Sequence, residues 1–364
     1  MPSFFDAHYH ISAGDRHSLS LHFTRPCRLF HADRDMLSVL RRNPFAFGPV
    51  NPLERIYRRF RFHDCFARLG EVPPLDTRQR EIVDELHRQG TVVLESYIPQ
   101  ETLAVMRAEF EQALRELRFE TPCLAQSRLD PVRHSALIDN FLYGTPEQLR
   151  QAGAAFERSE AHSLEQAIRD FNPSTLTVYM LELSATYRRI WLDPVLLTIA
   201  AHYLGMVPKL AEAYVRRNFP SPYRTMNHYW HRDLNDRYQL LKGFVFLSDC
   251  TLDNGPHEFI RGSHADYGRL NGKRYFTDAE VDAEHPHGSA TRLVSEVKAG
   301  TVILEDTRGL HRARMPLTGY RDLGYMVFMP MADDTTVKCY DFPRSAFSGL
   351  SPLQRAFVPS CDLA

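Results

Sequence analysis

The chain has 364 residues, of which 43% are hydrophobic and 24% are charged, which is enough material for a well-buried core. A formal net charge of −1 gives no overall attraction to nucleic acid or to an anionic membrane, so we expect neither as a partner. We find no signal-peptide pattern and no long uncharged apolar window. The six cysteines are widely spaced without a CxxC pair, which indicates a reducing, cytoplasmic location.

The first half of the chain has a predominantly helical pattern after an irregular start. Residues 1–76 are rich in His, Arg, Phe and Pro without a sustained period, and we interpret them as an N-terminal extension. Residues 77–89 have apolar side chains at helical spacing, and Gly90 follows where a C-cap is favoured. The run TVVLESYI (91–98) predicts a strand. Further helices are predicted at 99–117, 164–171, 183–191 and 194–204.

The second half changes to short β-rich runs separated by turn residues. Helices first and strands later make the chain α+β, and the strand pattern favours a double-stranded β-helix, that is, a jelly-roll or cupin-like core with flanking helices. We expect the main domain over 77–345, its jelly roll mainly within 210–332, and a C-terminal tail over 346–364. The predicted strands are 210–219, 239–247, 257–260, 291–297, 301–304, 310–314 and 323–329.

The pattern H-x-D, which offers a metal one imidazole and one carboxylate, occurs at 31–33, 231–233 and 264–266. A non-haem iron oxygenase needs a second imidazole on the same face of the metal, and in a jelly roll it arrives several strands later. Four strand-like runs separate 231–233 from His311, whereas only two follow 264–266 before it and no β-rich region follows 31–33 for a long stretch. The predicted Fe(II) ligands and catalytic centre are therefore His231, Asp233 and His311.

A buried cation is the third element of such a site. 2-Oxoglutarate chelates iron through its keto acid end, so its far carboxylate needs a partner inside an apolar barrel. Arginine offers a two-pronged donor for a carboxylate. Arg321 follows His311 after one turn and is the predicted partner, with Arg314 and Thr318 as rivals or helpers for co-substrate binding.

The sequence identifies the residues of the substrate pocket less specifically than the metal ligands. Four residues near the predicted metal are aromatic or polar and are candidates for lining it, although they fit core positions of the barrel mouth equally well. They are Asn227, Tyr229, Trp230 and Tyr214. The segment 264–290, rich in Gly, His and charged residues, is a candidate lid.

Several motifs resemble the phytanoyl-CoA dioxygenase (PhyH-like) family, from about residue 77 to residue 330. They are LHRQG (86–90), WHRD (230–233), DNGP (253–256), RGSH (261–264) and GLH (309–311) with Arg321 after it. The resemblance implies Fe(II), 2-oxoglutarate and O2, with release of succinate and CO2, and a dioxygenase that hydroxylates a small natural-product or lipid-derived molecule. It also implies that RGSH is structural, and Asp233 favours hydroxylation over halogenation. Many relatives have Ser or Thr where this chain has Ala313.

Two other classes of function remain as alternatives. His8 and His10 resemble the first-strand H-x-H of metal-dependent amidohydrolases, but that (β/α)8 fold requires alternating strands and helices throughout. A non-catalytic jelly-roll protein that binds metal or ligand is the second alternative.

Overall fold

Two antiparallel β-sheets organise the part of the chain that this computed structural model describes. That part comprises residues 59–116, 175–220, 226–233, 240–266, 268–271, 275–332, 335 and 340–364, with the backbone of short strands elsewhere. These short strands pair as β1 (His10–Ile11) with β2 (Leu21–His22), and as β4 (Pro122–Leu124) with β5 (Phe156–Arg158). The predicted helix at 164–171, the 31–33 pattern, and the side chains of His8 and His10 lie outside the described residues.

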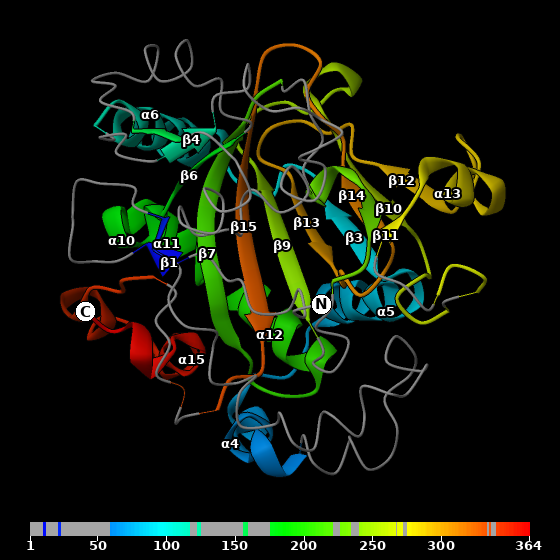
Figure 1. Cartoon of the computed structure of the whole chain (residues 1–364). Helices are drawn as coiled ribbons and strands as arrows, with labels where there is room; N and C mark the ends of the chain where they lie inside the picture. The colour runs from blue at the N-terminus through cyan, green and yellow to red at the C-terminus, as the bar shows by residue number, and fades with distance from the viewer. Residues whose placement is uncertain are drawn as a thin grey trace.

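The larger sheet is antiparallel throughout. Its central strands run side by side through the middle of the molecule (Figure 1). Its strand order is β3 (Thr91–Leu94), β13 (Val302–Glu305), β9 (Leu241–Phe246), β15 (Arg321–Met329), β7 (Lys209–Asn218) and β6 (Thr175–Val178).

The smaller sheet is also antiparallel, with the order β11 (Tyr275–Phe276), β8 (Trp230–His231), β14 (His311–Ala313), β10 (His257–Ile260) and β12 (Arg292–Val294). From β7 to β10, and again from β12 to β15, successive strands alternate between the two sheets. This winding is a double-stranded β-helix, so the predicted jelly-roll core is confirmed.

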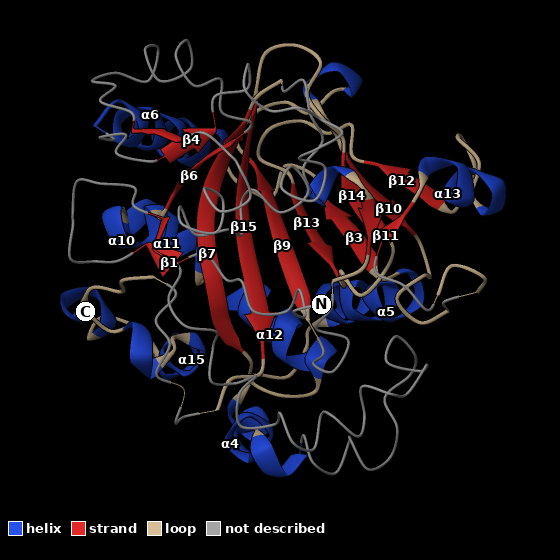
Figure 2. Ribbon diagram, viewed as in Figure 1, coloured by secondary structure: helices blue, strands red, loops and turns tan. Residues whose placement is uncertain are grey.

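Helices flank the strands (Figure 2) and bury their apolar stripes on the outer face of the larger sheet. They are α5 (Thr77–Gln89), α6 (Gln100–Glu116), α10 (Met180–Leu183), α11 (Ala185–Trp191), α12 (Pro194–Leu204) and α15 (Pro352–Phe357). The shorter helices are α4 (His63–Ala67), η1 (Arg68–Glu71), η4 (Met226–His228), η6 (Leu252–Asn254), α13 (Asp278–Glu284), α14 (Arg344–Phe347) and η7 (Ser360–Asp362).

Side-chain alternation gives the larger sheet two different faces. On β9, Val245 packs into the helix-side core, whereas Phe244 packs into a second apolar cluster with Ile303 and Leu323. We call the space that this second cluster faces, between the two sheets, the barrel interior. The same alternation turns charged side chains of the larger sheet into the barrel interior, among them Lys242, Glu305 and Arg321.

Local sequence signals located several elements correctly. α5 and α12 have the predicted bounds, and each is followed by a left-handed glycine, Gly90 and Gly205. The strand predicted at 91–98 ends at Leu94. β6, β8, β11 and α13 were not predicted, and the segment interpreted as a candidate lid contains both β11 and α13.

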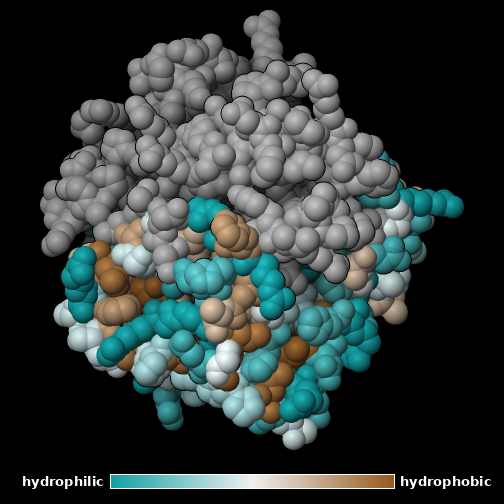
Figure 3. Space-filling model, turned by 90° about the horizontal axis from the view of Figure 1, so that it is seen from below, coloured by the Kyte–Doolittle hydropathy of each residue, from teal (hydrophilic) through white to brown (hydrophobic). Residues whose placement is uncertain are grey.

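The described residues near both ends of the chain share the core of the main domain. Phe62, Cys65 and Phe357 all belong to the large helix-side cluster. Seen from below, apolar side chains on the described surface are scattered among hydrophilic ones (Figure 3). Among the described residues, no helix is long and apolar enough to cross a membrane.

Candidate metal centre

The three predicted ligands meet at the inner face of the smaller sheet. His231 on β8 lies directly opposite His311 on β14, and their ring centroids are 4.2 Å apart. Asp233 follows β8, where its backbone N–H donates to the carbonyl of Thr307 at 2.9 Å. One potential ligand atom from each of the three side chains lies within 4.8 Å of the others. The chain therefore brings together the residues that the H-x-D pattern and strand counting selected.

Backbone hydrogen bonds set the tautomer of both imidazoles. Nδ1 of His231 lies 2.8 Å from the carbonyl of Tyr229, and Nδ1 of His311 lies 2.9 Å from the carbonyl of Gly309. A carbonyl only accepts, so each Nδ1 carries the proton and each Nε2 is the unprotonated nitrogen, which is the form that binds a metal. Burial lowers the pKa of His311 to about 3, which keeps the ring neutral.

Asp233 completes the donor set as a carboxylate. Its Oδ2 lies 3.9 Å from Nε2 of His311 and 2.6 Å from the ammonium of Lys242. Burial alone would raise the pKa of Asp233, but the positive charge of Lys242 outweighs it and holds this pKa well below its usual range. Two neutral imidazoles and one carboxylate are the donors that non-haem Fe(II) takes in oxygenases, so these residues fit that metal.

Arg321 provides a buried cation in the same barrel interior. Its side chain is 1% exposed, and its Nε and Nη1 have no hydrogen-bond partner among the described residues. Buried polar groups are nearly always hydrogen-bonded, so two orphaned guanidinium nitrogens indicate that a ligand completes the site. A carboxylate matches both the charge and the geometry of these donors.

A second polar pair in the barrel interior was missed by sequence reasoning. His257 on β10 and Glu305 on β13 are both buried, and Nε2 of His257 lies 2.8 Å from Oε1 of Glu305. The ring centroid of His257 is 5.6 Å from that of His311. Single charged residues within apolar strands, such as Lys242 in LLKGFVFL and Glu305 in TVILED, were the available signal.

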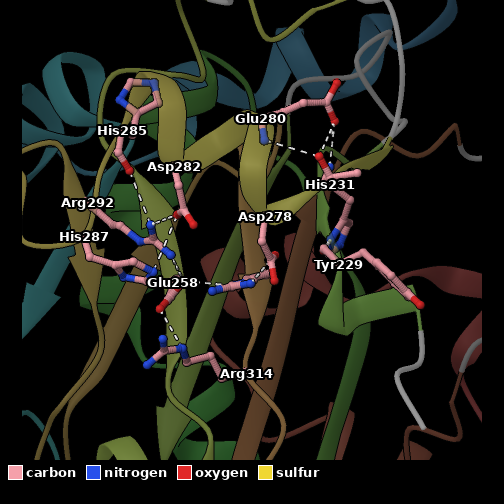
Figure 4. Close-up of polar contacts among 12 residues, drawn as sticks. Tyr229, His231, Glu258, Asp278, Glu280, Asp282, His285, His287, Arg292 and Arg314 are labelled. Atoms are coloured by element: carbon pink, nitrogen blue, oxygen red, sulfur yellow. Dashed lines mark hydrogen bonds and ion pairs between the residues drawn. The ribbon is translucent and has the colours of Figure 1, made fainter.

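Trp230 and Arg314 lie on the opposite, outer face of the smaller sheet. Trp230 is fully buried in an apolar cluster that includes Val281 of α13, because neighbouring residues of a strand point to opposite faces. Arg314 pairs with the buried Glu258 at 2.9 Å (Figure 4). The structure therefore assigns Trp230 to the core rather than to a substrate pocket, and it places Arg314 away from Arg321 and the candidate ligands.

Glu258 is the centre of a charged network on that outer face. Its Oε2 accepts from Arg312 at 2.8 Å and from Arg292 at 3.0 Å, and both guanidinium groups also stack on the ring of Trp230. Asp278 and Asp282 of α13 bind the same two arginines at 2.6 Å. This network fastens α13 over β8, on the far side of the strand from the candidate ligand.

The other predicted pocket and co-substrate residues fall in different places. Thr318 lies in an exposed turn, where its N–H donates to the carbonyl of Asp253, so it is not brought to the site. Asn227 and Tyr229 are half-buried immediately before β8. Tyr214 stacks on Tyr325 across β7 and β15, with centroids 4.9 Å apart, on the face that continues into the barrel interior.

Tyr275 of β11 is a further residue at the site that the sequence did not indicate. It lies opposite His231 in the smaller sheet, with ring centroids 6.1 Å apart. The segment interpreted as a lid therefore contributes a strand to the wall beside the candidate ligand, rather than only an open loop.

The RGSH motif has a structural role. Ser263 accepts a hydrogen bond from the N–H of Leu310, next to His311, at 2.7 Å. His264 points under α5, where Nε2 lies 3.2 Å from the carbonyl of His87, and a side chain at Gly90 would collide with its ring. The exclusion of His264 as a ligand is consistent with this placement. Antiparallel sheets likewise exclude the (β/α)8 fold that an amidohydrolase would require.

Comparisons with known proteins bear on the same region. A family model described as phytanoyl-CoA dioxygenase (PhyH) matches residues 86–319. HygX from Streptomyces hygroscopicus, solved with nickel and 2-oxoglutarate, is 18% identical over 71% of this chain and 88% of its own, with a TM-score of 0.42. EctD from S. alaskensis, solved with bound Fe, is 20% identical over 73% and 79%, with a TM-score of 0.41. No curated protein matches the sequence.

Proposed function

This chain belongs to the phytanoyl-CoA dioxygenase (PhyH) family, whose enzymes depend on Fe(II) and 2-oxoglutarate, and we propose that it hydroxylates a small molecule with release of succinate and CO2. In this proposal His231, Asp233 and His311 hold Fe(II), and Arg321 binds the far carboxylate of 2-oxoglutarate. One observation carries it: a three-residue donor set shares one barrel interior with a buried guanidinium, two nitrogens of which have no partner among the described residues.

Bound Fe(II) supplies the activation of O2, by which 2-oxoglutarate is oxidised and one oxygen atom is transferred to a C–H bond of the substrate. The protein's own contribution is positioning. Backbone carbonyls fix the two imidazoles, and Lys242 holds the carboxylate of Asp233 in its ionised form. Arg321 orients the co-substrate, and the apolar cluster around Phe244 excludes bulk water from the reacting atoms.

The substrate class in this proposal is a natural-product or lipid-derived molecule. Rings are available beside the candidate ligands: Tyr275 next to His231, and Tyr325 with Tyr214 along the larger sheet. Tyr325 also meets Phe244 edge to face at 5.5 Å. An apolar or aromatic body of the substrate would pack on these rings, and half-buried Asn227 and Tyr229 offer polar contacts at the same end.

The test is anaerobic addition of Fe(II) and 2-oxoglutarate, followed through the weak visible charge-transfer band of the chelate. The wild type and the control His287→Ala, whose side chain is exposed, should both develop the band, and His231→Ala should not. A folded wild type without the band would exclude the proposed site. A band without succinate formation across a broad substrate screen would instead favour the non-catalytic binding protein.

A further inference from the structure

The turn between β13 and β14, residues 306–310, holds two candidate ligands through its backbone. The carbonyl of Thr307 accepts from the backbone N–H of Asp233 at 2.9 Å. Two residues later, the carbonyl of Gly309 lies 2.9 Å from Nδ1 of His311. Both carbonyls belong to one short turn, so its conformation sets where the carboxylate and this imidazole lie relative to each other.

The residue between these two carbonyls binds a buried cation next to the ligands. The carbonyl of Arg308 accepts from Nη1 of Arg232 at 2.8 Å, and the same Nη1 donates to the carbonyl of Ser263 at 2.6 Å. Arg232 is buried and stands between His231 and Asp233 in the sequence. Three consecutive carbonyls of the turn therefore contact the segment that carries the first two ligands and the ring of the third.

Asp306 fixes the conformation of this turn. Its carboxylate is fully buried, Oδ1 accepts from the backbone N–H of Arg308 at 3.1 Å, and both oxygens pair with the guanidinium of Arg308. The carbonyl of Asp306 accepts from the N–H of Gly309 at 2.9 Å, and its N–H donates to the carbonyl of Gly90 at 2.8 Å. One residue thus closes the turn on itself and joins it to the residue that follows α5.

Tyr203 connects this carboxylate to the helix layer. Its hydroxyl donates to Oδ2 of Asp306 at 2.6 Å, and its ring centroid lies 4.8 Å from that of His87. Tyr203 is on α12 and His87 is on α5, two helices that pack on the outer side of the larger sheet. Hydrogen bonds to a charged group are among the stronger ones in proteins, so Asp306 is held firmly from the helix layer.

We propose that Asp306 and Tyr203 are positioning residues for the metal centre, an inference that rests on the proposed function. The buried carboxylate and the phenol hydroxyl hold the turn whose carbonyls orient Asp233 and His311. Removal of an outer group that orients a metal ligand typically costs about ten- to a hundredfold in metal affinity. Metal affinity therefore reports on this role independently of catalysis.

The experiment compares two Tyr→Phe variants that each lose one buried hydroxyl. Tyr203→Phe removes the donor to Asp306, and Tyr187→Phe removes a hydroxyl that donates to the carbonyl of Met106 at 2.8 Å in the same core cluster. Both variants should lower the melting temperature to a similar extent. In an EPR titration of free Mn(II), only Tyr203→Phe should bind the metal about three- to tenfold more weakly.

Asp306→Asn removes the charge of the carboxylate and keeps the shape of the side chain. The amide cannot accept from the guanidinium through two oxygens, so Mn(II) affinity should fall by about ten- to a hundredfold. With saturating Fe(II) and 2-oxoglutarate under anaerobic conditions, the charge-transfer band of this variant should be shifted or weakened, because the ligands are held less uniformly. The band of Tyr187→Phe should match that of the wild type.

The results distinguish this positioning role from the proposed function. Wild-type Mn(II) affinity in both Tyr203→Phe and Asp306→Asn would overturn the positioning role and leave the oxygenase assignment intact. Equal weakening in Tyr203→Phe and Tyr187→Phe would overturn it as well, because metal affinity would then follow stability alone. If Asp306→Asn does not fold, the two Phe variants decide. Failure of the wild type to bind Mn(II) would overturn both proposals.

Discussion

The ammonium of Lys242 lies 2.6 Å from Oδ2 of Asp233, and this ion pair connects the larger sheet to the residues that follow β8. The same oxygen is the one nearest to Nε2 of His311. A fixed positive charge thus stands beside the atoms that would receive a divalent cation. It keeps the carboxylate ionised, but it also repels a metal and competes with it for that oxygen.

Removing this charge should strengthen metal binding. In Lys242→Met, which keeps the length of the side chain, we expect Mn(II) to bind at least about tenfold more tightly in the absence of 2-oxoglutarate, because two cations a few ångströms apart repel each other. EPR titration of free Mn(II) measures this. Lys242→Arg retains the charge and should bind as the wild type does. Weaker binding by the Met variant would mean that Lys242 mainly orients Asp233.

Arg321 should control co-substrate affinity, and Arg314 should not. Arg321→Leu removes the buried guanidinium, so we expect 2-oxoglutarate affinity to fall by about a hundredfold or more at constant Mn(II) affinity. Arg314→Leu is the matched control, because that guanidinium pairs with Glu258 on the outer face. Calorimetric titration of 2-oxoglutarate into both Mn(II)-loaded variants measures the two affinities. A larger loss in the Arg314 variant would contradict the assignment of Arg321.

Glu258 should matter for stability. Glu258→Gln removes the negative partner of Arg292 and Arg312 and leaves their buried charges with less compensation, so we expect a loss of about 3 kcal/mol in the free energy of unfolding. Urea denaturation measures it. Glu284→Gln breaks a pair with the highly exposed Arg269 and should cost less than about 1 kcal/mol. Similar losses of unfolding free energy in the two variants would mean that the network around Glu258 does not contribute more to stability than an exposed ion pair.

Trp230 should behave as a core residue. Trp230→Ala empties a fully buried site and should cost about 3–5 kcal/mol of stability, whereas Trp230→Phe should cost less. Because the indole points away from the ligands, Trp230→Phe should leave Mn(II) and 2-oxoglutarate affinities unchanged. Thermal unfolding combined with the same titrations tests both statements. An altered affinity for Mn(II) or 2-oxoglutarate in a stably folded Trp230→Phe variant would mean that Trp230 contributes to the site.

Local signals explain which parts of the fold were predictable. α5 begins at a capping box formed by Asp76 and Gln79 and ends at Gly90, and α12 begins after Asp193 with Pro194 in its first turn. These signals act within one or two turns of the chain, so the sequence reveals them directly. β8 and β11 are two residues long and exist only through pairing with distant strands, which no local pattern reveals.

The sequence alone determined the helices with clear caps, the β-rich second half, and the choice of His231, Asp233, His311 and Arg321, because spacing along a jelly roll decides which segments can return to one site. The tertiary structure decided which face each neighbouring residue occupies. It turned His257, Glu305 and Lys242 into the barrel interior and Trp230 and Arg314 out of it. The physical reason is that a shift of one residue in strand register moves every side chain to the other face, and register is fixed only when the two sheets pack.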